Sequence, residues 1–154
     1  MCSEPYSVPL VTRVLASYRE LTGAPLLAPR PDESADGLAR RLYAADFVVL
    51  AHDTGPDPLF TYANLSAQRL FEREWTNFVG LPSRLSAELP ERADRERLLD
   101  RVAADGFIDD YAGVRIAKSG RRFRIRGATV WNVTDTSGRR IGQAATFNDW
   151  SPVE

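Results

Sequence analysis

The sequence predicts an α+β fold in which one antiparallel sheet, closed by hairpins, packs against helices on one face. Three strand-like runs in the second half of the chain carry this prediction, at residues 107–118, 121–133 and 141–150. Two turn sequences separate the runs, Ser119-Gly120 and Asp135-Thr136-Ser137-Gly138. Short turns of this kind join antiparallel strands, whereas a parallel pair needs a long crossover.

The middle run indicates how the sheet is buried. Its apolar-face positions are Phe123, Ile125, Thr129, Trp131 and Val133, and its arginines are Arg122, Arg124 and Arg126. Because successive side chains of a strand point to opposite faces, this alternation predicts that the first set faces the core and the arginines face water. The arginines, with Arg121, could meet an acidic partner or nucleic acid. A solvated sheet face is the favoured interpretation, because no exposed aromatic residues are interleaved with them.

The first half of the chain adds helices and two more strands. The expected elements are a helix from Pro9 up to Gly23, a helix at 33–45, strands at 47–52 and 58–62, and helices starting at Asn64, at 74–79 and at 90–104. Asn64 suits the start of its helix, because its side chain can accept a hydrogen bond from a free backbone N–H. We divide the chain into an N-terminal helical extension (1–45) and a sheet domain (46–154).

Composition argues against several classes of site and partner. The 154 residues carry a net charge of −1, which gives no electrostatic argument for direct binding of nucleic acid or an anionic membrane. No apolar run approaches the roughly 20 residues of a membrane helix, and the N-terminus lacks a secretion signal, so a cytoplasmic protein is expected. Cys2 and His52 are the only residues of their kinds, so neither an internal disulfide nor a metal site is expected.

The order of elements after residue 46 resembles that of a PAS domain. Three passages make the resemblance specific. Phe60-Thr61-Tyr62-Ala63-Asn64 is similar to the PAS passage from strand into helix, Phe78-Val79-Gly80-Leu81-Pro82 to the later glycine segment, and Lys118-Ser119-Gly120-Arg121 to the hairpin turn before the fourth strand. The resemblance implies a PAS-like five-stranded antiparallel sheet in the order 2-1-5-4-3.

Within the PAS superfamily, the chain resembles the MEKHLA domain, which occurs at the C-terminus of plant class III homeodomain-leucine zipper proteins and as stand-alone bacterial and algal proteins. The resemblance covers about residues 10–150 and implies the stand-alone bacterial form. It is carried by His52-Asp53, Asp57-Pro58, Tyr62-Ala63-Asn64-Leu65, Leu81-Pro82-Ser83-Arg84, Ser86-Ala87-Glu88, Gly106-Phe107-Ile108, Tyr111-Ala112-Gly113-Val114-Arg115-Ile116, Thr129-Val130-Trp131-Asn132 and Gly142-Gln143-Ala144-Ala145-Thr146-Phe147.

The same resemblance bears on cofactors. Ser83 stands where light-sensing PAS domains carry the cysteine that forms the flavin adduct, and a serine hydroxyl is not a comparable nucleophile. Counted from the hairpin turn, the positions of the flavin-ring amides fall on Arg115 and Ile125. Haem-binding PAS sensors commonly take a histidine from the helix before the third strand, and residues 83–104 contain none. We therefore expect no cofactor.

A small-molecule site is expected where the PAS pocket lies. By resemblance Arg84 and Arg115 border this pocket, and two guanidinium groups could hold a small polar or anionic ligand. The expected ligand-binding residues are Arg84, Arg115, Ser83, Tyr62 and His52. The small residues Gly142, Ala144 and Ala145 of the last strand are expected to leave space there. The alternative is that the arginines form ion pairs with Glu88, Asp109 or Asp110 over a filled core.

His52 and Asp53 raise the possibility of catalysis. They could act as a general base with its orienting carboxylate, with Asp57 near in sequence. Adjacent residues of a strand point to opposite faces, and no nucleophile or metal partner follows, so a histidine bonded to loop backbone is the favoured interpretation. No catalytic residue is assigned, and a small α+β enzyme using His52 and Asp53 stands as the alternative function.

The favoured function is a non-enzymatic sensory or protein-interaction module. Such a module needs a way to pass on its signal, and PAS domains often pair through N-terminal helices. We therefore expect a homodimer with Val11, Val14, Leu15 and Tyr18 of the first helix at or near the contact.

Overall fold

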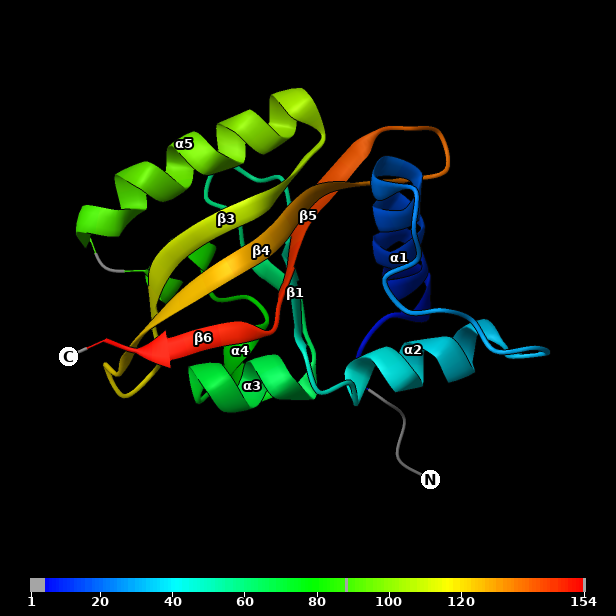
Figure 1. Cartoon of the computed structure of the whole chain (residues 1–154), viewed down its shortest axis with the longest axis horizontal. Helices are drawn as coiled ribbons and strands as arrows, with labels where there is room; N and C mark the ends of the chain where they lie inside the picture. Colours follow the sequence, from blue (N-terminus) through cyan, green and yellow to red (C-terminus); the bar gives the residue numbers. More distant parts are fainter. Residues whose placement is uncertain (1–4, 88, 154) are drawn as a thin grey trace.

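The computed structural model describes residues 5–87 and 89–153, with the side chains of 89–95 and 99 left undescribed. Its helices are α1 (Val8–Thr22), α2 (Ala35–Tyr43), α3 (Leu65–Phe71), α4 (Trp75–Phe78) and α5 (Leu89–Asp105), with a 3-10 turn η1 (Ser83–Ser86). Its strands are β1 (Val48–His52), β2 (Phe60–Ala63), β3 (Phe107–Ile116), β4 (Arg122–Thr134), β5 (Arg140–Phe147) and β6 (Asp149–Pro152) (Figure 1). None of the described helices is long and apolar enough to cross a membrane.

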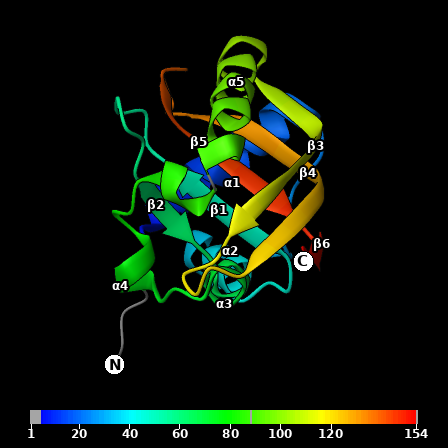
Figure 2. The same ribbon diagram turned by 90° about the vertical axis from the view of Figure 1, so that its left-hand side faces the viewer.

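The strands form one antiparallel sheet in the order β2-β1-β5-β4-β3, which confirms the predicted order. The β3–β4 hairpin is its longest feature (Figure 2). Along its edge away from β3, β4 pairs with β5 over residues 129–134 and with β6 over residues 123–126. The last apolar run, expected as one strand at 141–150, is therefore two strands, β5 and β6, that pair one after the other along β4.

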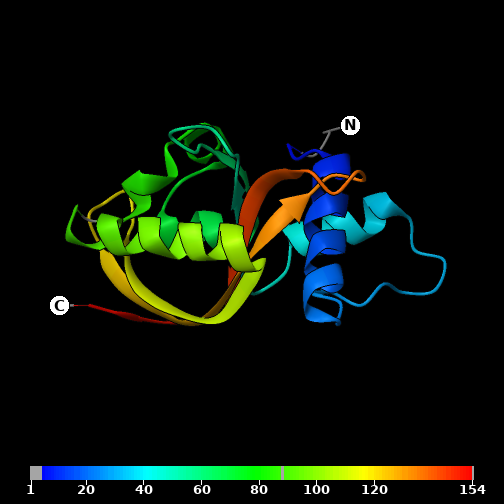
Figure 3. The ribbon, with the colours of Figure 1, turned by 90° about the horizontal axis from the view of Figure 1, so that it is seen from above.

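Each face of the sheet carries its own apolar core, and helices lie on both sides of the sheet (Figure 3). The inner face lies under α3, α4, η1 and α5, and the outer face lies under α1 and α2. Neighbours in β1 show the division, since Val48 packs with Phe71 in the inner core while Val49 packs with Val11 in the outer core. The helices of residues 65–105 thus gather on one face, as expected. Because the N-terminal extension covers the opposite face, the sheet as a whole carries helices on both.

The alternation expected along the middle run changes at Gly127. Phe123 and Ile125 are buried in the inner core, but Trp131 and Val133 are buried in the outer core. At this point the register of β4 against β3 shifts by one residue, and Gly127 adopts φ +60°. An extra residue in a strand reverses which face the following side chains occupy. The prediction that the apolar residues of this run share one face is therefore wrong.

Trp131 holds α1 on the outer face. Its indole Nε1 donates to the carbonyl of Val14 at 3.2 Å, and the ring of Tyr18 packs edge-on against it with 4.9 Å between centroids. A polar contact adds to this docking, because Ser17 Oγ accepts a hydrogen bond from the backbone N–H of Thr134 at 2.9 Å. The extension is therefore joined to the central hairpin by both apolar and hydrogen-bonded contacts.

The same docking removes part of the expected dimer contact. Val11 and Val14 are each 1% exposed, because they pack on the sheet of their own chain. These two residues cannot also meet a second copy while α1 is docked. Leu15 and Tyr18 stay partly exposed, and dimerisation through them is still a prediction.

Asn64 links three elements through one buried side chain. Its Oδ1 accepts from Val49 N and Ala67 N, each at 3.1 Å, and its Nδ2 donates to the carbonyls of Leu42 at 3.2 Å and Phe47 at 2.8 Å. The bond to Ala67 is the predicted helix cap. The other three join α2 and β1 to the start of α3, and Asn64 is fully buried.

Asn64→Ala should therefore cost more than an ordinary helix cap. Loss of the cap costs about 1 kcal/mol, and each buried backbone group left unpaired adds about 1–3 kcal/mol. We expect the free energy of unfolding, measured by urea titration, to fall by about 3 kcal/mol or more. Ser34→Ala is the matched control, because Ser34 caps α2 through a single exposed bond to Gly37 N and should cost about 1 kcal/mol. Equal losses in the two variants would contradict the linking role of Asn64.

Candidate functional site

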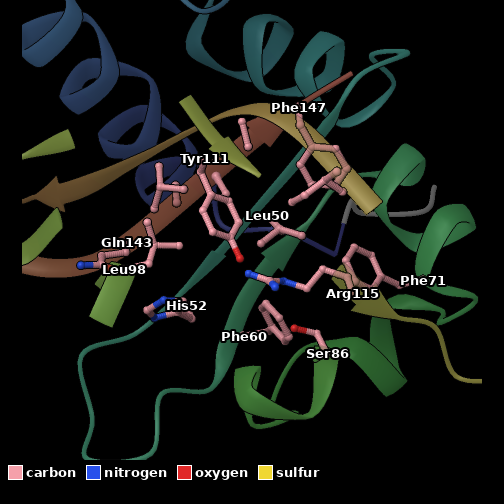
Figure 4. A pocket seen from close by; sticks show the side chains of 15 residues that line it. Leu50, His52, Phe60, Phe71, Ser86, Leu98, Tyr111, Arg115, Gln143 and Phe147 are labelled. Carbon is pink, nitrogen blue, oxygen red and sulfur yellow. The ribbon is translucent and has the colours of Figure 1, made fainter. Parts of the chain in front are cut away.

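A cavity of about 50 Å³ lies between the inner face of the sheet and the helices that cover it (Figure 4). By the same measure one water molecule needs roughly 10–15 Å³, so the space suits a small molecule. Its apolar walls include Leu50, Phe60, Phe71, Leu98, Ile125, Ala128, Val130, Ala145 and Phe147. Its polar residues are His52, Ser86, Tyr111, Arg115 and Gln143. Mostly apolar walls with a few convergent polar groups are typical of ligand sites.

Arg115 brings a positive charge to this cavity. The residue is only 8% exposed. Its Nη1 donates to the carbonyl of Val114 at 3.1 Å, and its guanidinium carbon lies 5.2 Å from the centroid of the Tyr111 ring. Within the described residues, no carboxylate lies at ion-pair distance from it. Asp109 and Asp110, two of the partners considered for it, are exposed instead, and Glu88 lies outside the described residues.

Tyr111 and Gly113 shape the wall beside Arg115. Tyr111, Gly113 and Arg115 lie two residues apart along β3, so the side-chain positions of all three are on the inner face. A Cβ added at Gly113 would collide with the Tyr111 hydroxyl and would lie 2.9 Å from its Cζ. The hydroxyl end of the tyrosine ring therefore lies over the glycine, and the face of the ring lies against the guanidinium. Only a residue without a side chain leaves room for this arrangement.

A row of polar side chains closes the other end of the cavity. His52, Gln143 and Asn132 are direct neighbours across β1, β5 and β4 on the inner face. Gln143 Nε2 donates to Asn132 Oδ1 at 3.2 Å, and Asn132 Nδ2 donates to the carbonyl of Val102 in α5 at 2.9 Å. This row fixes the helix over the sheet and places hydrogen-bonding groups at the end of the cavity away from Arg115.

Arg84 lies elsewhere. Its Nε contacts Asp57 Oδ1 at 3.1 Å, and both side chains are about half exposed, at 45% and 50%. It lines a polar cleft of about 300 Å³ beside the β1–β2 loop rather than the apolar cavity. The expectation that it reaches the pocket is therefore corrected. Arg84 does form an ion pair, but its partner, Asp57, is not among the partners considered from the sequence.

Ser83 and Tyr62 are also displaced from the expected site. Ser83 is buried at the start of η1, where its carbonyl accepts from Ser86 Oγ at 2.7 Å, and Ser86 is the residue that reaches the cavity. Tyr62 points to the outer face, whereas Phe60, two residues earlier in β2, points to the inner face. The two side chains lie on opposite faces because the register of β2 against β1 shifts between them. The Tyr62 hydroxyl is buried with no hydrogen bond to any described residue, and burial raises the pKa of this hydroxyl.

His52 lines the cavity, but it does not form the catalytic pair considered with Asp53. Its Nδ1 lies 2.7 Å from the backbone carbonyl of Asp53. The Asp53 carboxylate instead accepts from the backbone N–H groups of Gly55 at 3.2 Å and Leu59 at 3.0 Å. Both contacts hold the β1–β2 loop, which is the favoured interpretation of the sequence.

The small residues of β5 serve two purposes. Ala145 faces the cavity between Leu50 and Val130 of the neighbouring strands and leaves space there. Gly142 has a different reason for being small. A Cβ at this position would collide with the backbone carbonyl oxygen of His52. The expectation that Gly142 makes room for a ligand is therefore corrected, because it makes room for the end of β1.

Sequence reasoning did not assign Tyr111, Ser86 or Gln143 to the site. Tyr111 could have been found, because Tyr111, Gly113 and Arg115 share one strand face by their spacing of two residues. Ser86 could not, because it depends on which residue of a short 3-10 turn points inward.

A family model of the MEKHLA domain matches residues 8–152. Two homeobox-leucine zipper proteins of Arabidopsis thaliana, ATHB-14 and ATHB-9, are each 27% identical to the chain over 156 and 157 residues. Each match covers 98% of this chain and 18% of the relative, so the chain spans less than a fifth of these relatives.

Solved structures of PAS type share the fold. An RNA-binding light-oxygen-voltage receptor matches with a TM-score of 0.63 and 17% identity, covering 80% of this chain and 36% of that one. A PAS domain from Colwellia psychrerythraea matches with a TM-score of 0.59 and 13% identity, covering 72% of this chain and 92% of that one. At such identities the likeness shows the fold alone.

Gly142→Ala should test the close approach at the end of the site. The new methyl group would meet backbone, so β1 and β5 must separate locally, and overpacking of this kind costs about 1–3 kcal/mol. Gly55→Ala is the control, because a Cβ there has only an ordinary 3.5 Å contact with Asp53 Oδ1 and should change stability by less than about 0.5 kcal/mol. Urea unfolding of the two variants gives the comparison. A neutral Gly142→Ala would show that the strands do not need this contact.

Proposed function

Because the chain belongs to the MEKHLA domain family and has a PAS-like fold, we propose that it is a sensory module that binds a small carboxylate-bearing ligand beside Arg115. The ligand lies in the cavity between the inner face and the helices α3, η1 and α5. Its carboxylate meets the guanidinium, and its apolar body meets the surrounding side chains. Binding, rather than turnover, is the activity of the site.

The buried charge of Arg115 carries this proposal. A guanidinium has five N–H donors, and the hydrogen bond recorded for this one goes to the carbonyl of Val114, the residue before it. Removing a charge from water without a counter-charge destabilises a fold by several kcal/mol. A carboxylate in the cavity would supply the counter-charge and could accept two parallel hydrogen bonds. The Tyr111 ring offers the cation only its weakly attractive face.

The rest of the cavity favours a short ligand with an apolar body. Leu50, Ala145 and Val130 form the row across three strands next to the polar end, and Ala128 and Tyr111 belong to the following row toward Arg115. Same-face rows of a sheet are about 7 Å apart, twice the rise per residue. The distance from one row to the next accommodates a ligand with a chain of three or four carbons. Butyrate is therefore a suitable probe, although it is not proposed as the natural ligand.

The contacts of the polar groups favour binding over catalysis. His52, the only histidine of the sequence, contacts the Asp53 carbonyl, and Ser86 Oγ donates to the carbonyl of Ser83. Neither contact activates a nucleophile, which would require a serine bonded to a base. A module of this kind would pass on its state through a partner.

Butyrate should stabilise the chain, and the effect should depend on Arg115. At tenfold above its dissociation constant, a ligand stabilises the native state by about 1.4 kcal/mol, which raises the unfolding midpoint of a domain this size by about 3–5 °C. Butyramide, the neutral analogue of the same shape, should give a much smaller rise. Arg115→Gln should lose at least about tenfold in butyrate affinity while remaining folded.

Arg124→Gln is the matched control. Arg124 lies on the neighbouring strand, is exposed and points to the outer face, so its removal changes the net charge without touching the cavity. Its butyrate response should equal that of the unaltered chain. If butyrate and butyramide act alike, or Arg115→Gln responds like Arg124→Gln, Arg115 is not an anion site and the protein-interaction function stands without a ligand.

A further inference from the structure

Tyr111 stands between the cavity and a groove on the outside of the protein. The groove, of about 520 Å³, runs between α5 and β3. Leu98 and Tyr111 line both the groove and the cavity. Leu98 is 6% exposed and held in a small core with Val102 and Ile108, whereas Tyr111 is only partly buried. Tyr111 is therefore less constrained than Leu98, the other residue that lies between the groove and the cavity.

The local backbone gives Tyr111 this position. The register of β3 against β4 shifts on both sides of it, between Ile108 and Tyr111 and between Tyr111 and Gly113. Bulges of this kind redirect a side chain and occur beside functional sites. Because β3 is the last strand of the sheet order, no further strand restrains Tyr111 from outside. The ring can leave its place over Gly113 without breaking a strand ladder on that side.

We propose that Tyr111 determines which ligands this site accepts: its ring limits the length of the anion held by Arg115, and the anion enters from the α5–β3 groove past this ring. The inference rests on the proposed function and adds to it a size limit and a route. With the ring over Gly113, the cavity holds a short carboxylate. With the ring displaced, the cavity and the groove become one longer site.

The charges at the two sides of the cavity favour this route for an anion. The polar cleft beside the β1–β2 loop also adjoins the cavity, through His52 and Gln143. Among the described side chains, its charged residues are four carboxylates (Asp53, Asp57, Glu96, Asp100) and two guanidinium groups (Arg84, Arg140). The described side chains of the α5–β3 groove include two guanidinium groups (Arg97, Arg101) and one carboxylate (Asp110). A negative ligand is therefore repelled at the cleft and attracted at the groove.

The size limit is tested with butyrate and 4-phenylbutyrate, which share the carboxylate and differ by one terminal ring. The unaltered chain should bind butyrate and bind 4-phenylbutyrate at least tenfold more weakly. Tyr111→Ala should bind 4-phenylbutyrate at least tenfold more tightly than the unaltered chain does, because the space of the lost ring receives the ligand ring. Calorimetric titration gives the affinities.

Gly113→Ala provides a second test that keeps the tyrosine. The three atoms nearest to the added methyl group are side-chain atoms of Tyr111 and Arg115, and the two closest belong to Tyr111, so we expect the tyrosine to turn away while the backbone stays in place. This variant should also gain 4-phenylbutyrate binding. Circular dichroism and thermal unfolding establish that each variant is folded, and either folded variant suffices for the comparison.

The route is tested by charge reversal at matched exposed arginines. Arg101→Glu in the groove should slow association of 4,4,4-trifluorobutyrate about fourfold at low salt, the effect of reversing one charge at about 10 Å in water. Arg140→Glu in the cleft should leave the rate unchanged or lower it less. Fluorine NMR line shapes report the rates, and added salt should abolish the difference.

Three outcomes separate the two proposals. If butyrate binding does not depend on Arg115, the proposed function fails and this inference fails with it. If butyrate binds through Arg115 but the folded Tyr111→Ala and Gly113→Ala variants still reject 4-phenylbutyrate, only the role of Tyr111 is overturned. If Arg140→Glu slows association more than Arg101→Glu, the ligand enters through the cleft and the proposed route is wrong.

Discussion

The amide of Asn64 is the contact on which the arrangement of this chain most depends. One side chain accepts hydrogen bonds from two N–H groups and donates to two carbonyls. Those groups belong to α2, to β1 and the residue before it, and to α3, so the amide fixes the extension, the sheet and the first inner helix relative to one another. Because β1 carries Leu50 and His52 into the cavity, the geometry of the site depends on this contact as well.

The two faces of the sheet have different physical characters. On the outer face Trp131, Tyr62 and Val133 are buried under the extension and provide dense apolar packing. On the inner face the packing is interrupted by a cavity beside the nearly buried charge of Arg115. Cavities and unpaired charges both destabilise a fold. The outer face offsets this cost, so the extension contributes to a site that it does not touch.

Local features of the fold could be predicted from the sequence, and features set by strand register could not. The cap at Asn64 depends on one side chain and the next few residues, and it was predictable. The reversal of faces at Gly127 depends on how β4 pairs with β3, and the sequence of β4 alone shows uninterrupted alternation. Tyr62 was assigned to the wrong face for a related reason, because β2 has a register shift against β1.

Among the residues of the candidate site, too, some could be predicted from the sequence and others could not. The resemblance placed both Arg115 and Arg84 at the pocket. Arg115 does line the cavity, and it lies on a long strand whose pairing fixes the face to which it points. Arg84 lies on a 3-10 turn, where no periodicity fixes its direction, and Asp57 from a loop far away in sequence determines where it points. Gly142 shows that a position can require a small residue for more than one reason. Only the position of the His52 carbonyl distinguishes a close approach of backbone from space for a ligand.

The hydrogen bond between Trp131 and Val14 joins residues 117 positions apart and has a consequence for how the chain folds during synthesis. A ribosome adds roughly 5–20 residues per second, so α1 leaves it several seconds before β4 exists. Throughout that interval the apolar stripe of α1 lacks the central strand β4, which carries Trp131 and Val133 of the outer core. Helix α1 is therefore made before the other helices of this chain, but its packing is completed only after β4 has been made. Contacts so distant in sequence also slow folding, because a long loop must close before they form.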